Sequence, residues 1–384
     1  MRPSNFVQLF QQMAAENKSW HELSNVEEID SPALLIYPER VLENVRRMIA
    51  RVGHPARLCP HVKTHKLPEL VRLQMNLGIE KFKCSTIAEA EMVAECGAPE
   101  ILLAYQPVGP KVRRLVQLAK KFPKIQFSAL ADDADALRTL SQASAAADVS
   151  IGIFVDLDVG MHRCGIGNEG DALALYRLIN TLPGVKATGL HTYDGHVSDG
   201  DFAVRTEKCD AAFAFVSGLR EKLLREKLMV PRIVVGGTPA FPIHAKREGV
   251  ECSPGTCVLW DEGYGSRCRD LDFLHAALVL TRVISKPGGN RLCLDLGHKA
   301  IAAENPHPRV VFLNLPDAKA VTHSEEHLVI ETARASEFAV GATLYGIPWH
   351  VCPTVALHSE AVVVEDGFAK TRWKIMARNR ALTI

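Results

Sequence analysis

Short apolar runs alternate with amphipathic stretches between residues 33 and 236. Eight of these runs have the length of buried strands, and the stretches between them carry apolar residues at helical spacing. The strand-like runs cover residues 33–37, 56–60, 81–85, 100–105, 125–130, 149–158, 187–193 and 232–236. This count and this alternation predict a parallel (β/α)8 barrel of the TIM type rather than an open doubly wound sheet.

The pattern changes beyond Tyr264, where strand-like runs follow one another without long helical stretches. They cover residues 273–284, 292–296, 309–313, 327–331, 361–365 and 371–375, and Asp366-Gly367 is typical of a β-hairpin turn. We therefore expect a (β/α)8 barrel over residues 29–265 and a C-terminal, mostly antiparallel β domain over residues 266–384. Residues 1–28, amphipathic from about Ser4 to Lys18, are expected to form a helical segment that packs on the C-terminal domain.

The composition favours small-molecule chemistry. The 384 residues include 45 Lys and Arg against 44 Asp and Glu, and the net charge of +1 gives no electrostatic footprint for nucleic acid or an anionic membrane. Hydrophobic residues make up 47% of the chain, yet we find no apolar run that would span a bilayer and no signal peptide. Ten Cys without CxxC pairs do not predict a disulfide framework. We expect a cytoplasmic globular protein.

A basic segment, His61-Val62-Lys63-Thr64-His65-Lys66, follows the second predicted strand. A lysine that points into a pocket beside other cations has a lowered pKa, and its neutral amine can form a Schiff base with a carbonyl compound. His61 and His65 alternate with Lys63, so in an extended segment the three side chains share a face. The competing interpretation is a basic loop in water, which is the usual place for such residues.

Other polar residues lie where predicted strands end, and in a barrel these ends converge on one mouth. Arg163 follows the sixth strand, and Tyr193 and His196 follow the seventh. His196 is a candidate base or, equally, a structural loop histidine. Two turns come after the eighth strand, Gly236-Gly237-Thr238 and Ser253-Pro254-Gly255-Thr256. Their backbone N–H groups and hydroxyls can cradle a phosphate, although each turn taken singly is more often a plain tight turn.

A histidine and a cysteine stand two residues apart in the C-terminal module. In an extended segment His350 and Cys352 point to the same side. Imidazole and thiolate together suit Zn²⁺, and two protein ligands leave positions for water or substrate. The alternative is a half-buried histidine beside a core cysteine, which is more common for this spacing alone.

Together these features resemble the D-threonine aldolase and D-serine dehydratase family, which shares the fold-type III pyridoxal-phosphate architecture of alanine racemase. The resemblance spans about Ile29 to Ala377 and is carried by the order of the two modules and by four motifs. These motifs are Pro60-His-Val-Lys-Thr-His-Lys66, Gly160-Met-His-Arg-Cys-Gly165, Gly236-Gly-Thr238 and His350-x-Cys352-Pro-Thr354.

The resemblance implies a role for each matching residue. Lys63 would hold pyridoxal 5′-phosphate covalently, Arg163 would face the pyridine nitrogen, and Tyr193 would lie against the cofactor. The phosphate contacts would come from Gly236, Gly237, Thr238, Gly255 and Thr256. A divalent metal, zinc or manganese, would be bound by His350 and Cys352. His61 and His196 are further candidates for catalysis, and the family analogy implies a homodimer.

The implied substrate is a β-hydroxy-D-amino acid, and two reactions on it compete. Retro-aldol cleavage gives glycine and an aldehyde, whereas elimination from D-serine or 3-hydroxyaspartate gives a 2-oxo acid and ammonia. In the family, aldolases carry His-x-Asp and dehydratases carry His-x-Cys, so Cys352 departs from the aldolase pattern, while Pro353-Thr354 and Leu357-His358 resemble the aldolases. We favour the aldolase. A racemase, with Tyr264 as second base, and a non-catalytic pyridoxal-phosphate carrier fit the sequence less well.

Overall fold

The first of two sheets forms the barrel. The computed structural model describes residues 19–384, so the amphipathic stretch 4–18 lies outside the described residues. Among these residues, the first sheet has seven parallel strands hydrogen-bonded in chain order. They are β2 (Lys81–Cys84), β3 (Glu100–Leu103), β4 (Gln126–Ala131), β5 (Ile151–Leu157), β6 (Val185–Thr192), β7 (Arg232–Val235) and β8 (Glu251–Cys252). The expected α/β barrel class is confirmed.

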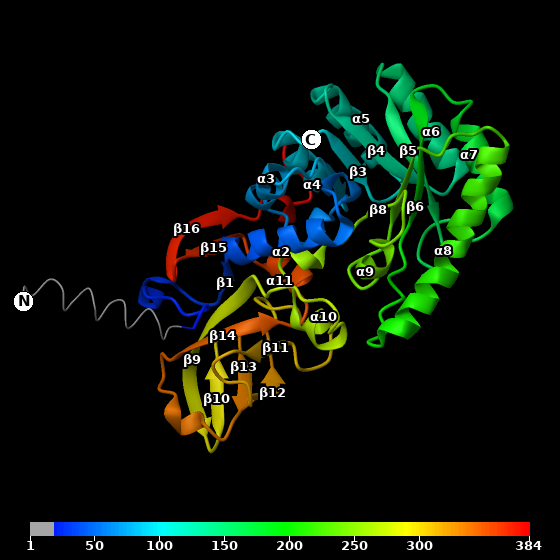
Figure 1. Cartoon of the computed structure of the whole chain (residues 1–384). Helices are drawn as coiled ribbons and strands as arrows, with labels where there is room; N and C mark the ends of the chain where they lie inside the picture. The colour runs from blue at the N-terminus through cyan, green and yellow to red at the C-terminus, as the bar shows by residue number, and fades with distance from the viewer. Residues whose placement is uncertain (1–18) are drawn as a thin grey trace, which may run out of the picture.

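Helices follow the strands and cover the outer face of this sheet (Figure 1). They are α3 (Pro68–Asn76), α4 (Ile87–Glu95), α5 (Pro110–Lys121), α6 (Ala134–Ala146), α7 (Glu169–Ile179), α8 (Phe202–Arg225) and the short α9 (Phe241–His244). Their starts follow from local sequence, because proline stands in the first turn of α3 and α5. Side-chain caps begin four others, from Thr86, Asp133, Asn168 and Asp201.

The gap between β8 and β2 is bridged by residues 58–61. The Cys59 N–H donates to the Cys252 carbonyl at 2.9 Å, and the Lys83 N–H donates to the Pro60 carbonyl at 2.9 Å. Isolated bridges pair Leu58 with Cys252 and His61 with Lys83, both parallel. This segment therefore takes the eighth place around the barrel, although it contains no regular strand. Its position brings the basic segment to the mouth.

The prediction that residues 33–37 form a barrel strand is wrong. This run is β1 (Ala33–Ile36), which pairs with β9 and β15 in the second sheet. It resembles a barrel strand because both of its faces are buried: Leu34 and Ile36 pack into the barrel core, whereas Leu35 packs into a cluster of the second body. The barrel strand that the sequence analysis lacked is β8 (Glu251–Cys252), which lies directly before the predicted turn 253–256.

The second body is a mostly antiparallel sheet, as predicted. Its strands are β1, β9 (Ala277–Gly288), β10 (Arg291–Leu294), β11 (Val310–Phe312), β12 (Lys319–His323), β13 (Leu328–Glu331), β14 (Thr343–Pro348), β15 (Glu360–Glu365) and β16 (Phe368–Lys374). The sequence analysis missed β12 and β14. The hairpin at Asp366-Gly367 is confirmed, since both residues have positive φ, 53° and 73°, between β15 and β16.

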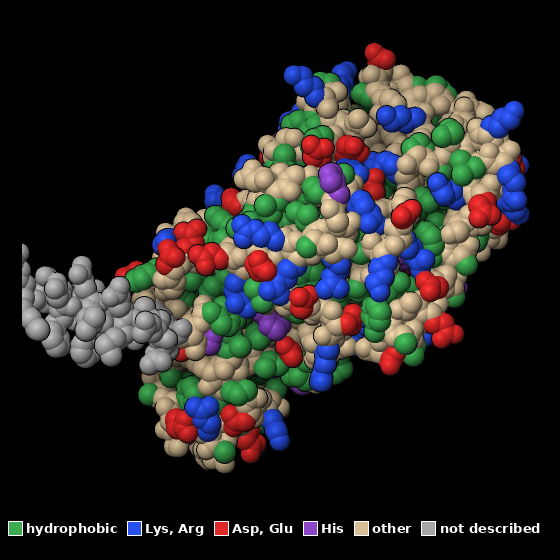
Figure 2. Space-filling view, in the orientation of Figure 1, with side chains coloured by type: hydrophobic (Ala, Val, Ile, Leu, Met, Phe, Trp, Pro, Cys, Tyr) green, Lys and Arg blue, Asp and Glu red, His purple; other side chains and the backbone are tan. Residues whose placement is uncertain are grey.

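Three further helices connect or flank the two bodies: α2 (Pro38–Val52), α10 (Glu262–Arg267) and α11 (Val351–Leu357). The first described residues contact the second sheet, where the Leu23 N–H donates to the Tyr345 hydroxyl at 3.1 Å. Acidic and basic side chains are interspersed over the visible face (Figure 2). No helix in residues 19–384 combines the length and the apolar character that a membrane crossing requires.

Candidate active site

A cavity of about 410 Å³ opens at the carboxyl ends of the barrel strands. Four of the residues that the sequence analysis selected line it: His61, Lys63, Arg163 and Tyr193. The remaining lining residues include Lys83, Ser85, Asp132, Asp156 and His191, which come from β2, the loop after β4, β5 and β6. The fold thus brings together side chains from His61 to Tyr193, 132 positions apart in the sequence, at the end of the barrel where α/β barrels carry their chemistry.

Lys63 lies in a single 3₁₀ turn (Val62–Thr64) instead of an extended segment. The His61 ring begins this turn, because its Nδ1 accepts from the Lys63 N–H at 3.4 Å. The fully buried Glu89 holds this segment, because it pairs with the ammonium of Lys66. Glu89 also accepts from the Ser85 N–H at 2.6 Å. The half-buried Lys63 side chain places its Nζ 6.0 Å from the ring centroid of Tyr193.

The expectation that His65 shares a face with Lys63 is wrong, because a helical turn rotates the chain between them. His65 points into the protein, where its Nδ1 accepts from the Leu67 N–H at 3.1 Å. Burial, together with the charge of Lys66, lowers the pKa of His65 to about 3. His61 stays at the cavity, and burial and the cations of Lys63 and Lys83 hold its pKa well below the usual range, so its ring is neutral.

Lys83 is a second lysine of the cavity, and the sequence analysis missed it. Its side chain is 3% exposed, its Nζ donates to Ser253 Oγ at 2.9 Å, and it lies 5.9 Å from the Tyr193 ring centroid. Burial lowers its pKa to about 8, and the Lys63 and Arg163 charges act in the same direction. The available signal was a lysine within a predicted strand of a parallel barrel, because such strands are covered on both faces and an ammonium is costly to bury.

Arg163 and Tyr193 meet over the cavity. The guanidinium carbon of Arg163 lies 4.7 Å from the Tyr193 ring centroid, and Arg163 itself is exposed at the rim. The loop that carries Arg163 is anchored by Asp132, whose Oδ2 accepts from the Gly165 N–H at 2.9 Å. His196 is exposed and does not line the cavity. It lies against the same loop, where a Cβ on Gly160 would come 3.0 Å from its Nε2.

The two glycine-containing turns pack against each other behind Tyr193. The buried Thr238 hydroxyl accepts from the N–H groups of Gly255 and Thr256, at 3.3 and 3.1 Å. A Cβ on Gly237 would lie 2.8 Å from Cε2 of Tyr193, so only glycine allows this approach. The turns are not part of the cavity lining described above. Glycine turns with N–H and hydroxyl groups are of the kind that bind phosphate, and here the Gly255 and Thr256 N–H groups donate to Thr238.

A buried Asp156–His191 pair was also missed from the sequence. His191 Nδ1 lies 2.6 Å from Asp156 Oδ1, and its Nε2 has no hydrogen-bond partner in the described part of the chain. Burial and the charge of Lys83 lower the pKa of His191 below its usual value, against the opposite effect of Asp156. The ring is therefore neutral, with its Nδ1 proton donated to the carboxylate.

His350 and Cys352 are adjacent in space, but not in an extended segment as predicted. His350 is the N-cap of α11, and Cys352 stands in its first turn. Burial would lower the pKa of His350, yet Cys352 and Glu304 outweigh it and raise the pKa to about 9. Burial would raise the pKa of Cys352, but His350 and then Lys63 outweigh it and lower the pKa. An imidazole beside a thiol of lowered pKa is a donor set that suits zinc.

This pair reaches the lysine turn through the thiol. Cys352 Sγ lies 3.2 Å from the Thr64 hydroxyl, next to Lys63, and 3.7 Å from the Thr256 hydroxyl of the second glycine turn. His350 also lines a smaller pocket of about 150 Å³ together with Tyr264 and Arg267. Burial raises the pKa of Tyr264, with further contributions from Tyr193 and Asp261, so this phenol stays protonated. The two modules therefore meet at one place.

A second group of possible metal ligands lies beneath the first glycine turn: Asp194, Cys209 and His244, with ligand atoms within 4.8 Å of one another. Hydrogen bonding explains this group better. His244 Nε2 lies 2.7 Å from Asp194 Oδ2, and Arg247 Nε donates to His244 Nδ1 at 3.2 Å. Because His244 Nδ1 accepts from the Arg247 guanidinium, the ring proton lies on Nε2 and is donated to the Asp194 carboxylate. The His244 ring therefore has no lone pair directed at the other two residues.

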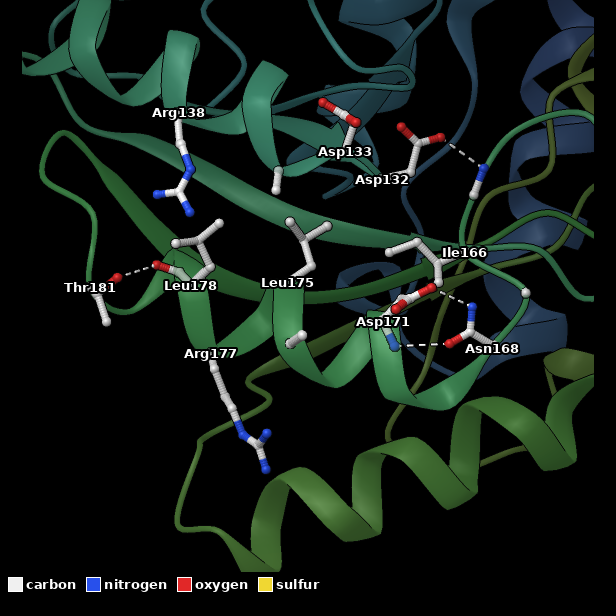
Figure 3. Close-up of a pocket in the computed structure, with 14 residues that line it drawn as sticks. Asp132, Asp133, Arg138, Ile166, Asn168, Asp171, Leu175, Arg177, Leu178 and Thr181 are labelled. Carbon is white, nitrogen blue, oxygen red and sulfur yellow. Dashed lines mark hydrogen bonds between the residues drawn. The ribbon is translucent and has the colours of Figure 1, made fainter.

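A groove of about 810 Å³ lies between α6 and α7 on the outside of the barrel (Figure 3). Arg138 on α6 and Arg177 on α7 lie toward the end of the groove opposite Asp132 (Figure 3). None of the predicted site residues lines it. Asp132 belongs to both the groove and the barrel cavity. The chemistry is therefore concentrated in the smaller cavity.

Known proteins resemble the chain over nearly its whole length. The profile of the family described as alanine racemase, N-terminal domain, matches residues 36–261, and that of the putative serine dehydratase domain matches residues 276–364. D-threonine aldolase of Arthrobacter sp is 32% identical over 91% of this chain and 93% of its own. For 3-hydroxy-D-aspartate aldolase of Paracoccus denitrificans (strain Pd 1222), the identity is 28% over 92% and 93%. The crystal structure of D-threonine aldolase from Filomicrobium marinum has a TM-score of 0.84 and 26% identity, and covers 91% of this chain and 96% of that one.

Proposed function

Because this chain belongs to the D-threonine aldolase and D-serine dehydratase-like family, with the barrel of alanine racemase, we propose that it is a pyridoxal phosphate-dependent lyase of the D-threonine aldolase type. It would cleave β-hydroxy-D-amino acids to glycine and an aldehyde. The observation that carries the proposal is the similarity to D-threonine aldolase over 91% of the chain, at 32% identity. The cavity with an amine, a guanidinium and an aromatic ring supports it.

The residues present fit pyridoxal phosphate. The Lys63 amine would bind the carbonyl carbon of the cofactor. The turns 236–238 and 255–256 would hold its phosphate, because the Thr238 hydroxyl accepts from the Gly255 and Thr256 N–H groups and can donate its own proton to a phosphate oxygen. A guanidinium only donates hydrogen bonds, so a ring nitrogen facing Arg163 would accept one and stay unprotonated. Tyr193 would pack against the ring, since it already lies between Lys63 and Gly237. When bound, the cofactor supplies an electron-withdrawing system that stabilises negative charge on the substrate.

We propose His350 and Cys352 as ligands of a divalent cation. Imidazole and thiolate favour zinc, while manganese remains an alternative because geometry and availability contribute to selection. A cation held there supplies a Lewis acid for the substrate's β-hydroxyl. The position of Cys352 against Thr64 would bring the β-carbon end of a substrate next to Lys63.

The base for the β-hydroxyl proton is assigned to His196. Its ring is exposed and forms no hydrogen bond within residues 19–384, whereas His61 uses Nδ1 to begin the lysine turn. His196 packs against Gly160 of the loop that carries Arg163, so it would stand beside the cavity that Arg163 lines. His61 would instead keep Lys63 in place and line the cavity as a neutral ring.

Cys352 favours a second candidate, a dehydratase that converts D-serine or 3-hydroxyaspartate to a 2-oxo acid and ammonia. In this reaction the Lys63 amine removes the α-proton, and the hydroxyl leaves from the β-carbon. The two reactions share the same cavity and differ in which proton is removed first. A racemase is less well supported, because the phenol of Tyr264 is largely buried beside Tyr193 and Asp261.

A product assay distinguishes these reactions. Purified protein is incubated with pyridoxal phosphate and D-threonine, either with Zn²⁺ or Mn²⁺ or with a chelator. We expect glycine and acetaldehyde in equal amounts, lost on chelation. Formation of 2-oxobutanoate and ammonia would instead identify the dehydratase, and the absence of both product pairs, with D-serine and 3-hydroxy-D-aspartate also unreacted, would refute the lyase.

We also propose that the enzyme works as a cytoplasmic homodimer on a small-molecule substrate. The support is the family analogy and the balanced charge of +1, which offers no surface for nucleic acid. Light scattering coupled to size exclusion would give the mass directly. A monomer that is fully active at assay concentration would contradict the dimer.

A further inference from the structure

One ring nitrogen of His350 is hydrogen-bonded to a carboxylate. Glu304 Oε1 lies 2.5 Å from His350 Nδ1. An ionised carboxylate has no proton to give, so Nδ1 carries the hydrogen and donates it. In a neutral imidazole the lone pair then lies on Nε2, which is the atom that remains for a metal ion. Metal-binding histidines in general donate their other N–H to such an acceptor, and this fixes both the tautomer and the ring orientation.

Glu304 is itself held in place. It stands in the loop between β10 and β11, and the Asn305 side-chain amide donates to Glu304 Oε1 at 2.9 Å. The same loop is tied to the first turn of α11, because the Ala302 N–H donates to Thr354 Oγ1 at 3.1 Å and this hydroxyl donates to the His350 carbonyl at 2.8 Å. The loop that carries Glu304 is therefore tied to the start of α11, which carries His350, and the Glu304 side chain itself is partly exposed.

The other carboxylate near the pair is already occupied. Asp261 is buried, its Oδ1 accepts from the Tyr264 N–H at 3.0 Å, and its Oδ2 accepts from the Val351 N–H at 3.0 Å. It thus caps α10 and positions the start of α11. Within residues 19–384, Glu304 is the carboxylate that forms a hydrogen bond with the His350 ring.

On the basis of the proposed function, we propose that Glu304 is a positioning residue for the metal site: it holds His350 in the Nδ1–H form and presents Nε2 to a divalent cation beside Cys352. Glu304 acts through His350 and does not coordinate the ion. The inference adds a third residue to a pair that the sequence pattern could show only as His-x-Cys, because residue 304 lies 46 positions from His350.

The test measures Zn²⁺ affinity by competition with a chromogenic chelator, on the purified full chain with and without pyridoxal phosphate. Glu304→Ala should weaken Zn²⁺ binding about 10- to 100-fold, the usual effect of losing such a partner. Glu304→Gln keeps a carbonyl oxygen for Nδ1–H and should lose only a few-fold. Glu325→Ala, an exposed carboxylate of the same domain paired with Lys299, is the matched control and should bind as the wild type. Thermal melts of all variants check folding.

The outcomes separate this inference from the proposal it rests on. A wild type that binds neither Zn²⁺ nor Mn²⁺ overturns the metal pair and the inference together. If the wild type binds Zn²⁺ and Glu304→Ala binds it equally well, the inference alone is wrong. If Glu304→Gln loses as much affinity as Glu304→Ala, Glu304 is a direct ligand and the positioning role is refuted. Weakened binding in the alanine variant with rescue by glutamine supports it.

Discussion

The Glu89→Gln substitution removes the negative charge beneath the Lys63 turn while preserving the shape of the side chain. Glu89 is fully buried, and the side chain of its partner Lys66 is only 13% exposed. Without the carboxylate, Lys66 keeps a largely buried charge with no counterion, and the Ser85 N–H loses a charged acceptor. Breaking such a pair by removing one partner typically costs about 3–5 kcal/mol, and a hydrogen bond to a charged group contributes about 1.5–3 kcal/mol.

We therefore expect Glu89→Gln to lower the free energy of unfolding by about 3 kcal/mol, which is roughly a 150-fold shift in the folding equilibrium. The assay is urea unfolding followed by circular dichroism, with the midpoint shift multiplied by the slope m. Lys66→Met in the same background should restore part of the loss, because no buried charge is left unpaired. Glu326→Gln, an exposed acid near Lys299, is the control and should change stability by less than about 0.5 kcal/mol.

The same variant also tests whether the buried Glu89–Lys66 pair positions Lys63 for cofactor binding. Because Glu89 fixes Lys66, and Lys66 directly follows the turn that carries Lys63, Glu89→Gln should also weaken pyridoxal phosphate binding. If Glu89→Gln unfolds within about 0.5 kcal/mol of the wild type, the pair contributes nothing net and the reasoning from burial is refuted.

Three other substitutions have defined outcomes. Lys63→Ala should abolish both the visible absorbance of bound pyridoxal phosphate and turnover; normal turnover would refute the role of Lys63. Lys83 has its pKa lowered from 10.5 to about 8, so the unfolded chain binds more protons than the folded one between these pH values, and wild-type stability rises with pH there. Lys83→Met lacks this gain. In urea titrations, the free energy of unfolding of the variant relative to wild type should fall by up to about 3 kcal/mol from pH 8 to 10.5. A difference that does not change with pH would contradict the lowered pKa of Lys83. Gly237→Ala places a Cβ 2.8 Å from the Tyr193 ring and should weaken cofactor binding in a fluorescence titration, whereas Gly167→Ala, with nothing within 4 Å, should not.

Periodicity and strand ends predicted the barrel, the β domain and four of the residues that line the cavity. The prediction worked because Lys63, Arg163 and Tyr193 are polar residues placed directly after apolar runs, where barrel geometry sends them to one mouth. It went wrong for β1, since a strand buried on both faces has the same pattern in either sheet.

Residues whose significance depends on distant partners could not be predicted. Lys83 is buried against Ser253, which lies 170 positions away, and this contact exists only in the folded barrel. Glu304 reaches His350 only after the β domain has folded. His350 and Cys352 were identified by spacing, but their helical geometry depends on Asp261, whose carboxylate binds the Val351 N–H from another element.

The alternating burial of β1 has a consequence for how the protein unfolds. Leu34 and Ile36 belong to the barrel core, while Leu35 and Tyr37 belong to the cluster around Tyr345. A strand whose neighbouring side chains anchor two cores cannot leave one of them without disturbing the other, so the two bodies should melt in a single cooperative transition instead of two. An excised barrel beginning after this strand would expose the surface that Leu34 and Ile36 cover, and the catalytic module is therefore not separable from the β domain as an independent folding unit.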